Sequence, residues 1–191
     1  MVVDEEDGEM KAYLYCVKGS KDTGYLHYLG GGVWGVTDER DCSYNGIVVA
    51  ECEIDGIERW KTEEFEKTDE VDGREYAMRW QGAIKDRGNG EFASDRAERK
   101  ELEDSSCLSM DDIIRYAGGI GKTFYAWRLK RVILNAMRLS KKERIPQSWK
   151  YFRDGVLVSI RPKWLAKILN KEKTAELRKT RFTQTKKGKR K

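Results

Sequence analysis

The sequence contains a single histidine and four cysteines, and this scarcity limits the chemistry it can support. The cysteines, Cys16, Cys42, Cys52 and Cys107, show no C-x-x-C spacing, and only His27 could supply an imidazole to a zinc site. We therefore expect no metal and no cofactor. A Ser-His or Cys-His hydrolase is also disfavoured, because its base would have to be His27, which lies in a glycine-flanked loop.

Long hydrophobic runs are absent as well. No window approaches the roughly 18 uninterrupted apolar residues of a membrane helix, and the first ten residues, MVVDEEDGEM, are acidic where a targeting peptide is basic. We therefore expect a cytoplasmic protein that contacts no membrane. The chain has 191 residues, of which 39% are hydrophobic and 37% charged, so we expect a single domain over residues 1–191 with very polar loops.

The charges present are divided between the two halves of the chain. Residues 1–106 hold 14 basic and 27 acidic residues, a net charge of −13, whereas residues 107–191 hold 24 basic and 6 acidic residues, a net charge of +18. Residues 179–191 form a basic tail with seven basic residues and no acidic one. Such a division indicates either a partner with a phosphate backbone or an acidic segment that covers a basic surface.

Short apolar runs predict an α+β fold with a barrel-like sheet. The predicted strands are Lys11–Val17, residues 47–54, a run from Phe124 onward, residues 156–160 and residues 174–179. One helix is predicted between Ser109, which can cap its start, and Gly118 or Gly119, which can end it. A second helix begins at Pro162 and completes a β-α-β unit at the C-terminal end; its Trp164 is assigned to the core.

Two polar regions interrupt this pattern. Residues 19–35, GSKDTGYLHYLGGGVWG, are glycine-rich and are predicted to form a loop. Residues 61–106 crowd acidic and basic side chains together and contain few branched apolar residues. We interpret them as a polar insertion within the domain, either partly helical around Ala97–Leu102 or partly disordered. A protein partner could bind through this acidic insertion.

The densest binding chemistry lies in SIRPKWLAKILNKEKTAELRKT, residues 159–180. Its K-T-x-E-x-R run places Lys173 before a strand and alternates Thr174, Glu176 and Arg178 on one predicted face. A cation, a hydroxyl, a carboxylate and a forked guanidinium can together contact a base edge and its phosphate or sugar. The alternative is an exposed strand face carrying an ordinary Glu176–Arg178 ladder.

This run resembles the opening strand, helix and signature of ASCH domains, relatives of the PUA and YTH folds, which begin with S-I-x-P and continue to G-x-K-x-x-E-x-R. Other blocks resemble the later elements of phage-type ASCH proteins: YLYCVKGS, GIVVAECEIDGI, SCLSMDDIIRYAGG, FYAWRLKRVIL and PQSWKY. The signature closes this chain instead of opening it, so the sequence is similar to a circularly permuted ASCH domain. The resemblance implies a small PUA-like mixed β-barrel with flanking helices.

The resemblance also implies which residues line the binding cleft. Lys173, Glu176 and Arg178 are the first candidates, and Ser159 and Arg161 are expected to reach the same cleft. Trp127, in the strand similar to the Y-A-W segment of the family, is the best candidate for stacking on a base. Lys171 stands where the family has glycine, and a lysine there disfavours a positive φ, so we expect the loop before Lys173 to differ in shape.

Three functions remain open at this stage. The first is an ASCH domain that binds RNA, a nucleotide or a modified nucleoside without changing it. The second is a hydrolase, a ribonuclease or an enzyme resembling the acetylcytidine amidohydrolases of the family, with Lys173 and Glu176 as catalytic residues. Those amidohydrolases have a threonine nucleophile where Glu176 stands, and only Ser106 or Asp104 could replace their glutamate. The third is a protein-interaction module that acts through the acidic insertion.

Overall fold

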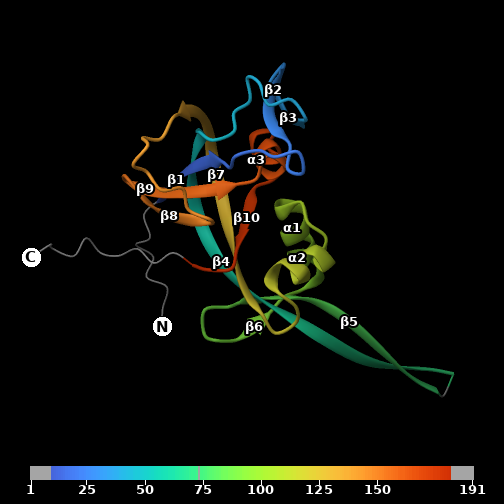
Figure 1. Cartoon of the computed structure of the whole chain (residues 1–191). Coiled ribbons are helices and arrows are strands. Elements are labelled where there is room, and N and C mark those ends of the chain that lie inside the picture. Colours follow the sequence, from blue (N-terminus) through green and yellow to red (C-terminus); the bar gives the residue numbers. More distant parts are fainter. Residues whose placement is uncertain (1–9, 73, 182–191) are drawn as a thin grey trace, which may run out of the picture.

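A computed structural model describes residues 10–72 and 74–181 of the chain (Figure 1). In chain order its elements are β1 (Met10–Cys16), β2 (Tyr25–Gly30), β3 (Val33–Thr37), β4 (Val48–Val71), β5 (Arg74–Asp86), β6 (Phe92–Ala93), α1 (Arg96–Ser106), α2 (Met110–Ala117), β7 (Thr123–Met137), β8 (Trp149–Phe152), β9 (Gly155–Ile160), α3 (Pro162–Leu169) and β10 (Ala175–Arg178). The described part of the chain is therefore a mixed α/β protein, mostly strands with three helices. None of these helices is long and apolar enough to span a bilayer.

One long strand organises the main sheet. The strand order is β10-β7-β4-β1-β9-β8, and the 24-residue β4 pairs with both β1 and β7 before continuing into a ribbon with β5. All of these pairs are antiparallel except β1 and β9. The parallel β1–β9 pair joins the start of the described chain to its last third, from Lys11↔Gly155 to Cys16↔Ile160. The sequence-based expectation that the C-terminal segment completes a sheet with the N-terminal strand is thus confirmed.

The expected barrel is not formed, because the main sheet stays open in the described residues. Its outer strands β10 and β8 share no backbone ladder there. Side chains cross the gap instead: the Arg178 guanidinium on β10 donates to the Ser159 carbonyl on β9 at 3.0 Å and to Ser148 Oγ at 3.2 Å. The Trp149 indole on β8 donates to Thr180 Oγ1 at 3.1 Å. Polar side chains therefore occupy the place of the ladder that would close the barrel.

The ends of the helices follow from their sequence. The Ser109 side chain caps α2 by accepting from the Asp112 backbone, and Gly118 ends the helix with a φ of 104°, as predicted. Pro162 occupies the first turn of α3, where its missing N–H costs nothing. Helix α1 covers the predicted helical stretch Ala97–Leu102 and begins with a capping box between Asp95 and Glu98.

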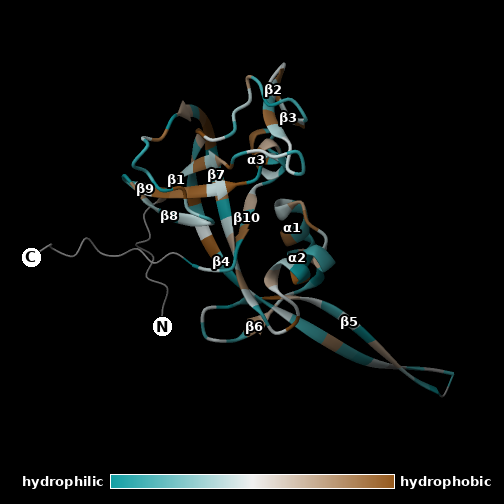
Figure 2. Ribbon diagram, in the orientation of Figure 1, coloured by the Kyte–Doolittle hydropathy of each residue, from teal (hydrophilic) through white to brown (hydrophobic). Residues whose placement is uncertain are grey.

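The core consists of two main clusters that flank the C-terminal segment. The larger cluster packs α3 against β1, β4 and β9, with Leu14, Val158 and Leu165 among its members. The second cluster lies under α1 and α2 and includes Trp60 and Leu177. Figure 2 shows hydrophobic residues gathered on strands of the main sheet such as β9, whereas the β4–β5 ribbon is largely hydrophilic. Strand β10 therefore lies where the two helical layers meet.

Two polar regions fold differently from the prediction. Residues 19–35 are not a simple loop, because β2 and β3 pair within them from Tyr25↔Thr37 to Gly30↔Val33. The first part of the expected insertion is an antiparallel ribbon, in which the end of β4 pairs with β5 over twelve rungs from Trp60↔Lys85 to Val71↔Arg74. A helix is present only further on, in α1. Most of the basic tail, residues 182–191, lies outside the described residues.

Candidate binding cleft

A cleft of about 610 Å³ opens between α2, the start of α3 and β10. It lies where the two core clusters meet, so α2 forms one wall and α3 the other. Its lining residues are Val17, Leu108, Asp112, Arg115, Tyr116, Gln147, Ser159, Ile160, Arg161, Lys163, Trp164, Lys173, Glu176, Leu177 and Arg178. Lys173, Glu176, Arg178, Ser159 and Arg161 were predicted to share one cleft, and the fold brings all five together.

Lys173 is a buried ammonium group at the base of the cleft, with 3% of the residue exposed. Its Nζ donates to the Ser106 carbonyl at 2.9 Å and to the Ala175 carbonyl at 2.7 Å, and it lies 3.4 Å from Glu176 Oε2. Three acceptors thus match the three N–H groups of the ammonium. Burial lowers the pKa of Lys173 from its ordinary value, while the Glu176 carboxylate opposes that change.

Glu176 links the two cations of the cleft. Its second oxygen, Oε1, lies 2.9 Å from Arg178 Nη2, and the side chains of Glu176 and Arg178 are 12% and 8% exposed. Removing one partner of a nearly buried ion pair is strongly destabilising, because the other charge is left uncompensated. The Arg178 guanidinium also lies 6.0 Å from the ring centre of the buried Trp127.

Two aromatic residues in the cleft walls were missed by the sequence reasoning. Trp164 was assigned to the core, but it is only partly buried, lines the cleft and has Lys173 Nζ 5.5 Å from its ring centre. Tyr116 on α2 lines the opposite wall and donates from its hydroxyl to the Leu177 carbonyl at 2.8 Å. The position of Trp164 just after the strand β9 and Pro162, beside the signature, is the signal that could have identified it.

Two predicted binding residues lie elsewhere. Trp127 is fully buried and belongs to the core, so its ring is not an exposed surface for stacking. Thr174 is exposed and lines a different hollow, because β10 begins only at Ala175 and the strand alternation does not extend back to residue 174. Thr174 instead joins the backbone network, accepting from the Leu129 N–H and donating to the Ser105 carbonyl.

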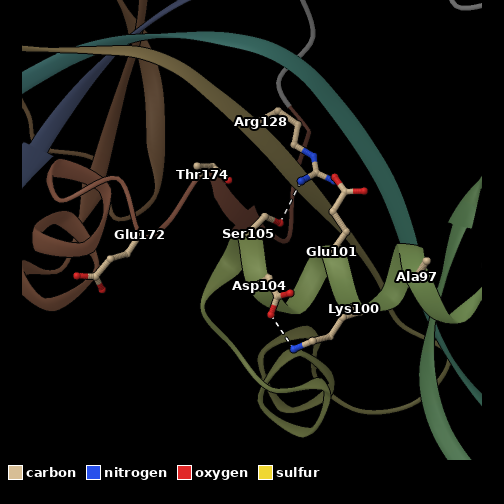
Figure 3. Close-up of a pocket in the computed structure, with 8 residues that line it drawn as sticks. All are labelled: Ala97, Lys100, Glu101, Asp104, Ser105, Arg128, Glu172 and Thr174. Carbon is tan, nitrogen blue, oxygen red and sulfur yellow. Dashed lines mark hydrogen bonds and ion pairs between the residues drawn. The ribbon is translucent and has the colours of Figure 1, made fainter.

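The second hollow lies beside α1 and is shown in Figure 3. Arg128 crosses it, donates to Ser105 Oγ at 3.0 Å and to Glu58 Oε2 at 2.9 Å, and forms an ion pair with Glu101 Oε1 at 3.1 Å. Asp104, on the same helix, is paired with Lys100 at 2.7 Å. Both basic side chains of this hollow, Lys100 and Arg128, are paired with carboxylates. Among the described residues, the hollow therefore has no unpaired basic side chain comparable to Arg161 or Lys163 in the cleft. Of the two residues considered as replacements for the amidohydrolase glutamate, Asp104 lines this second hollow and not the cleft. Ser106 contacts Lys173, but through its backbone carbonyl.

The loop before Lys173 keeps the shape that a glycine would give it. Lys171 has a φ of 63°, so the expectation that a lysine would change this loop is wrong. The end of α3 forms a Schellman motif, in which the Glu172 N–H bonds to the Lys167 carbonyl at 2.9 Å and the Lys171 N–H to the Ile168 carbonyl at 3.0 Å. These two bonds hold Lys171 in the left-handed region.

Within the residues that the structure describes, no cluster of three or more histidine, cysteine, aspartate or glutamate side chains could hold a metal ion. No family model matches the chain, and no curated protein or solved structure matches it either. The cleft must therefore be interpreted from its own chemistry.

Proposed function

We propose that this chain is a PUA-like, ASCH-type domain that binds RNA or a nucleotide in the cleft lined by Lys173, Glu176 and Arg178. One observation carries the proposal: a nearly buried ammonium, carboxylate and guanidinium are linked at 2.9 and 3.4 Å and face one cavity of about 610 Å³. That volume lies in the usual range for small-ligand sites, which run from about 300 to 1,000 Å³. The order of the blocks in the sequence supports a circular permutation of the ASCH arrangement.

The cleft walls match different parts of a nucleotide. Trp164 offers a partly exposed ring on which a base can stack. The first turn of α3 and the basic side chains of Arg115, Arg161 and Lys163 line the same cleft, and both features favour an anionic group such as a phosphate. Glu176 can accept from an exocyclic amine or a ribose hydroxyl.

Binding of a labelled single-stranded RNA and of free nucleotides, measured by fluorescence anisotropy and competition, tests the proposal. Trp164→Ala should weaken binding by about 1–3 kcal/mol through the loss of stacking. The control is Tyr28→Ala, because Tyr28 is an exposed aromatic residue on β2 that does not line the cleft. Equal losses in the two variants, or no loss in Trp164→Ala, would contradict the proposal.

Hydrolysis is the second candidate, and the pairing of Lys173 with Glu176 favours it. A buried lysine with a lowered pKa beside a carboxylate can support general acid-base chemistry. Against this, the three donors of Lys173 already have acceptors, which suits fixed hydrogen bonding better than proton transfer. Glu176→Gln should abolish turnover on a panel of RNAs and modified cytidines if the protein is an enzyme; no turnover by the wild type on any substrate would leave binding as the function.

A further inference from the structure

The outer part of the β4–β5 ribbon, residues 64–72 and 74–81, forms an arm with no described neighbour along most of its length. Figure 1 shows it extending from the body past α1 and α2, away from α3. The eight rungs from Glu64↔Gln81 to Val71↔Arg74 span roughly 24 Å at about 3.4 Å per residue. An isolated two-stranded ribbon is marginally stable in water, so an arm of this length gains from a surface that covers it.

One face of the arm carries three large apolar side chains of β5, together with the charged Lys67 and Arg74. Alternate residues of β5 share this face, and Tyr76, Met78 and Trp80 are 50%, 52% and 41% exposed. Trp80 stacks on Phe65 across the ribbon, with ring centres 5.5 Å apart and an interplanar angle of 15°. A row of exposed large apolar side chains on a projecting element is typical of an interaction surface.

The opposite face of the arm is acidic. Glu64, Glu66, Glu70 and Glu75 alternate onto it, and only Arg79 opposes them, paired with Glu66 at 3.3 Å. Glu70 and Glu75 are cross-strand partners, and like charges placed directly opposite each other destabilise a ribbon. A cationic partner would relieve this repulsion, whereas the arm of a second molecule would add to it.

The complementary charge lies on the rim of the cleft. Arg161 and Lys163 are exposed at the start of α3 and have no carboxylate partner among the described residues. Because the arm extends away from α3, it does not reach the rim of its own chain (Figure 1). The same division appears in the whole sequence, where residues 1–106 carry a net charge of −13 and residues 107–191 carry +18.

We propose that two copies of this chain associate by exchanging arms, so that the arm of each copy docks on the Arg161 and Lys163 rim of the other. Carboxylates of the acidic face meet the rim cations, and the face that carries Tyr76, Met78 and Trp80, on the other side of the ribbon, is turned away from the rim. A two-fold arrangement makes both contacts at once and closes the assembly at two copies. This inference goes beyond the proposed function, because the rim attracts carboxylates whether or not the cleft binds a nucleotide.

Sedimentation velocity of the full chain at about 50 mM and about 500 mM salt tests the exchange, since screening weakens exposed ion pairs. We expect a dimer that dissociates at the higher salt concentration. The variant Glu70→Lys/Glu75→Lys and the variant Arg161→Glu/Lys163→Glu should each weaken self-association by about tenfold or more. An equimolar mixture of the two variants should restore the dimer, because each arm then meets a rim of opposite charge.

Glu70→Gln/Glu75→Gln separates docking from folding of the arm. This change removes the like-charge rung and should stabilise the ribbon, yet it should weaken the dimer. Met78→Ser, on the face turned away from the rim, and Asp22→Asn/Asp38→Asn, on exposed loops, are the controls and should leave the dimer unchanged. A monomer at low salt and high protein concentration, a dimer insensitive to the glutamate and rim variants, or a mixture that fails to restore association would each overturn the proposal.

Discussion

At the scale of single residues, the charged side chains of the cleft were easier to predict from the sequence than the aromatic side chains that line it. The resemblance to ASCH domains suggested one cleft for Lys173, Glu176 and Arg178, whereas their spacing at a strand end indicated only that they are neighbours. Trp127 and Trp164 could not be told apart in this way, because which tryptophan is covered depends on packing between segments far apart in the sequence. In the structure Trp127 is fully buried and Trp164 lines the cleft.

Lys171 offers a direct test of strain at a single residue. A left-handed conformation costs a residue with a side chain about 1–2 kcal/mol, and glycine avoids this cost. Glycine also loses more conformational entropy on folding, which offsets part of the gain. Lys171→Gly should therefore raise the free energy of unfolding by about 0.5–1 kcal/mol in chemical denaturation. Lys142→Gly, at an exposed turn residue whose φ is not positive, is the matched control and should destabilise slightly. A loss of stability in Lys171→Gly would show that the left-handed loop is not what the native state contains.

Glu58 predicts how stability responds to acid. Burial alone would raise the pKa of Glu58, but hydrogen bonds from Lys85 and Arg128 outweigh it, and the net pKa lies below the ordinary value of 4.5. The unfolded chain therefore binds this proton more readily than the folded protein does, so the stability that Glu58 contributes is present above pH 4.5 and is lost as the pH falls through the folded pKa.

The comparison of wild type with Glu58→Gln at several pH values measures that contribution. At neutral pH, Glu58→Gln should lower the free energy of unfolding by about 1.5–3 kcal/mol, the usual contribution of hydrogen bonds to a charged group. The difference between the two proteins should shrink as the pH falls below 4.5. A difference that stays constant with pH would mean that Glu58 is not held as an ion pair in the folded state.

At the scale of elements, the sequence identified those with local signals. Helix α2 has a serine cap and a glycine stop, and β9 is an almost wholly apolar run, so both were predicted. The β4–β5 ribbon was missed because both of its faces meet solvent, and the usual contrast between a buried and an exposed side is absent. The alternation of Tyr76, Met78 and Trp80 was the only local sign of a strand there.

The parallel contact between β1 and β9 depends on a glycine. A Cβ on Gly155 would lie 2.0 Å from the Lys11 carbonyl oxygen, so the strands would have to separate. Gly155→Ala should lower the free energy of unfolding by about 3 kcal/mol. Gly56→Ala is the matched control, because no atom lies within 4 Å of its added Cβ, and its effect should stay within about 0.5 kcal/mol. Similar thermal denaturation midpoints for the two variants would argue against the β1–β9 pairing.

At the scale of the whole molecule, the sequence predicted that the two ends of the chain share one sheet, but the prediction that this sheet closes into a barrel is wrong. That the C-terminal segment completes a sheet with the N-terminal strand was expected from the similarity to a permuted domain, whereas the specific pairing of β1 with β9 was not predicted. Whether outer strands join by a ladder depends on a separation of a few ångströms, which no local pattern encodes. Here the Arg178 side chain reaches across to Ser159 and Ser148.

The charge of the molecule predicts its response to salt. The cleft carries five basic and two acidic side chains, so an RNA bound there should release counterions from its phosphates. The logarithm of the binding constant should therefore fall linearly as the logarithm of the salt concentration rises, and Arg161→Ala should reduce the slope by about 1. A binding constant that does not change with salt would exclude the phosphate contacts.

The most direct test of the account is a binding screen of nucleotides, modified nucleosides and single-stranded RNA against the wild type and Lys173→Ala, with thermal denaturation of both proteins in parallel. The account predicts that the wild type binds at least one member of the screen and that Lys173→Ala, while still folded, loses most of that affinity. Binding by the folded Lys173→Ala protein that equals the wild type would contradict the assignment of the cleft, as would the absence of any binding by the wild type.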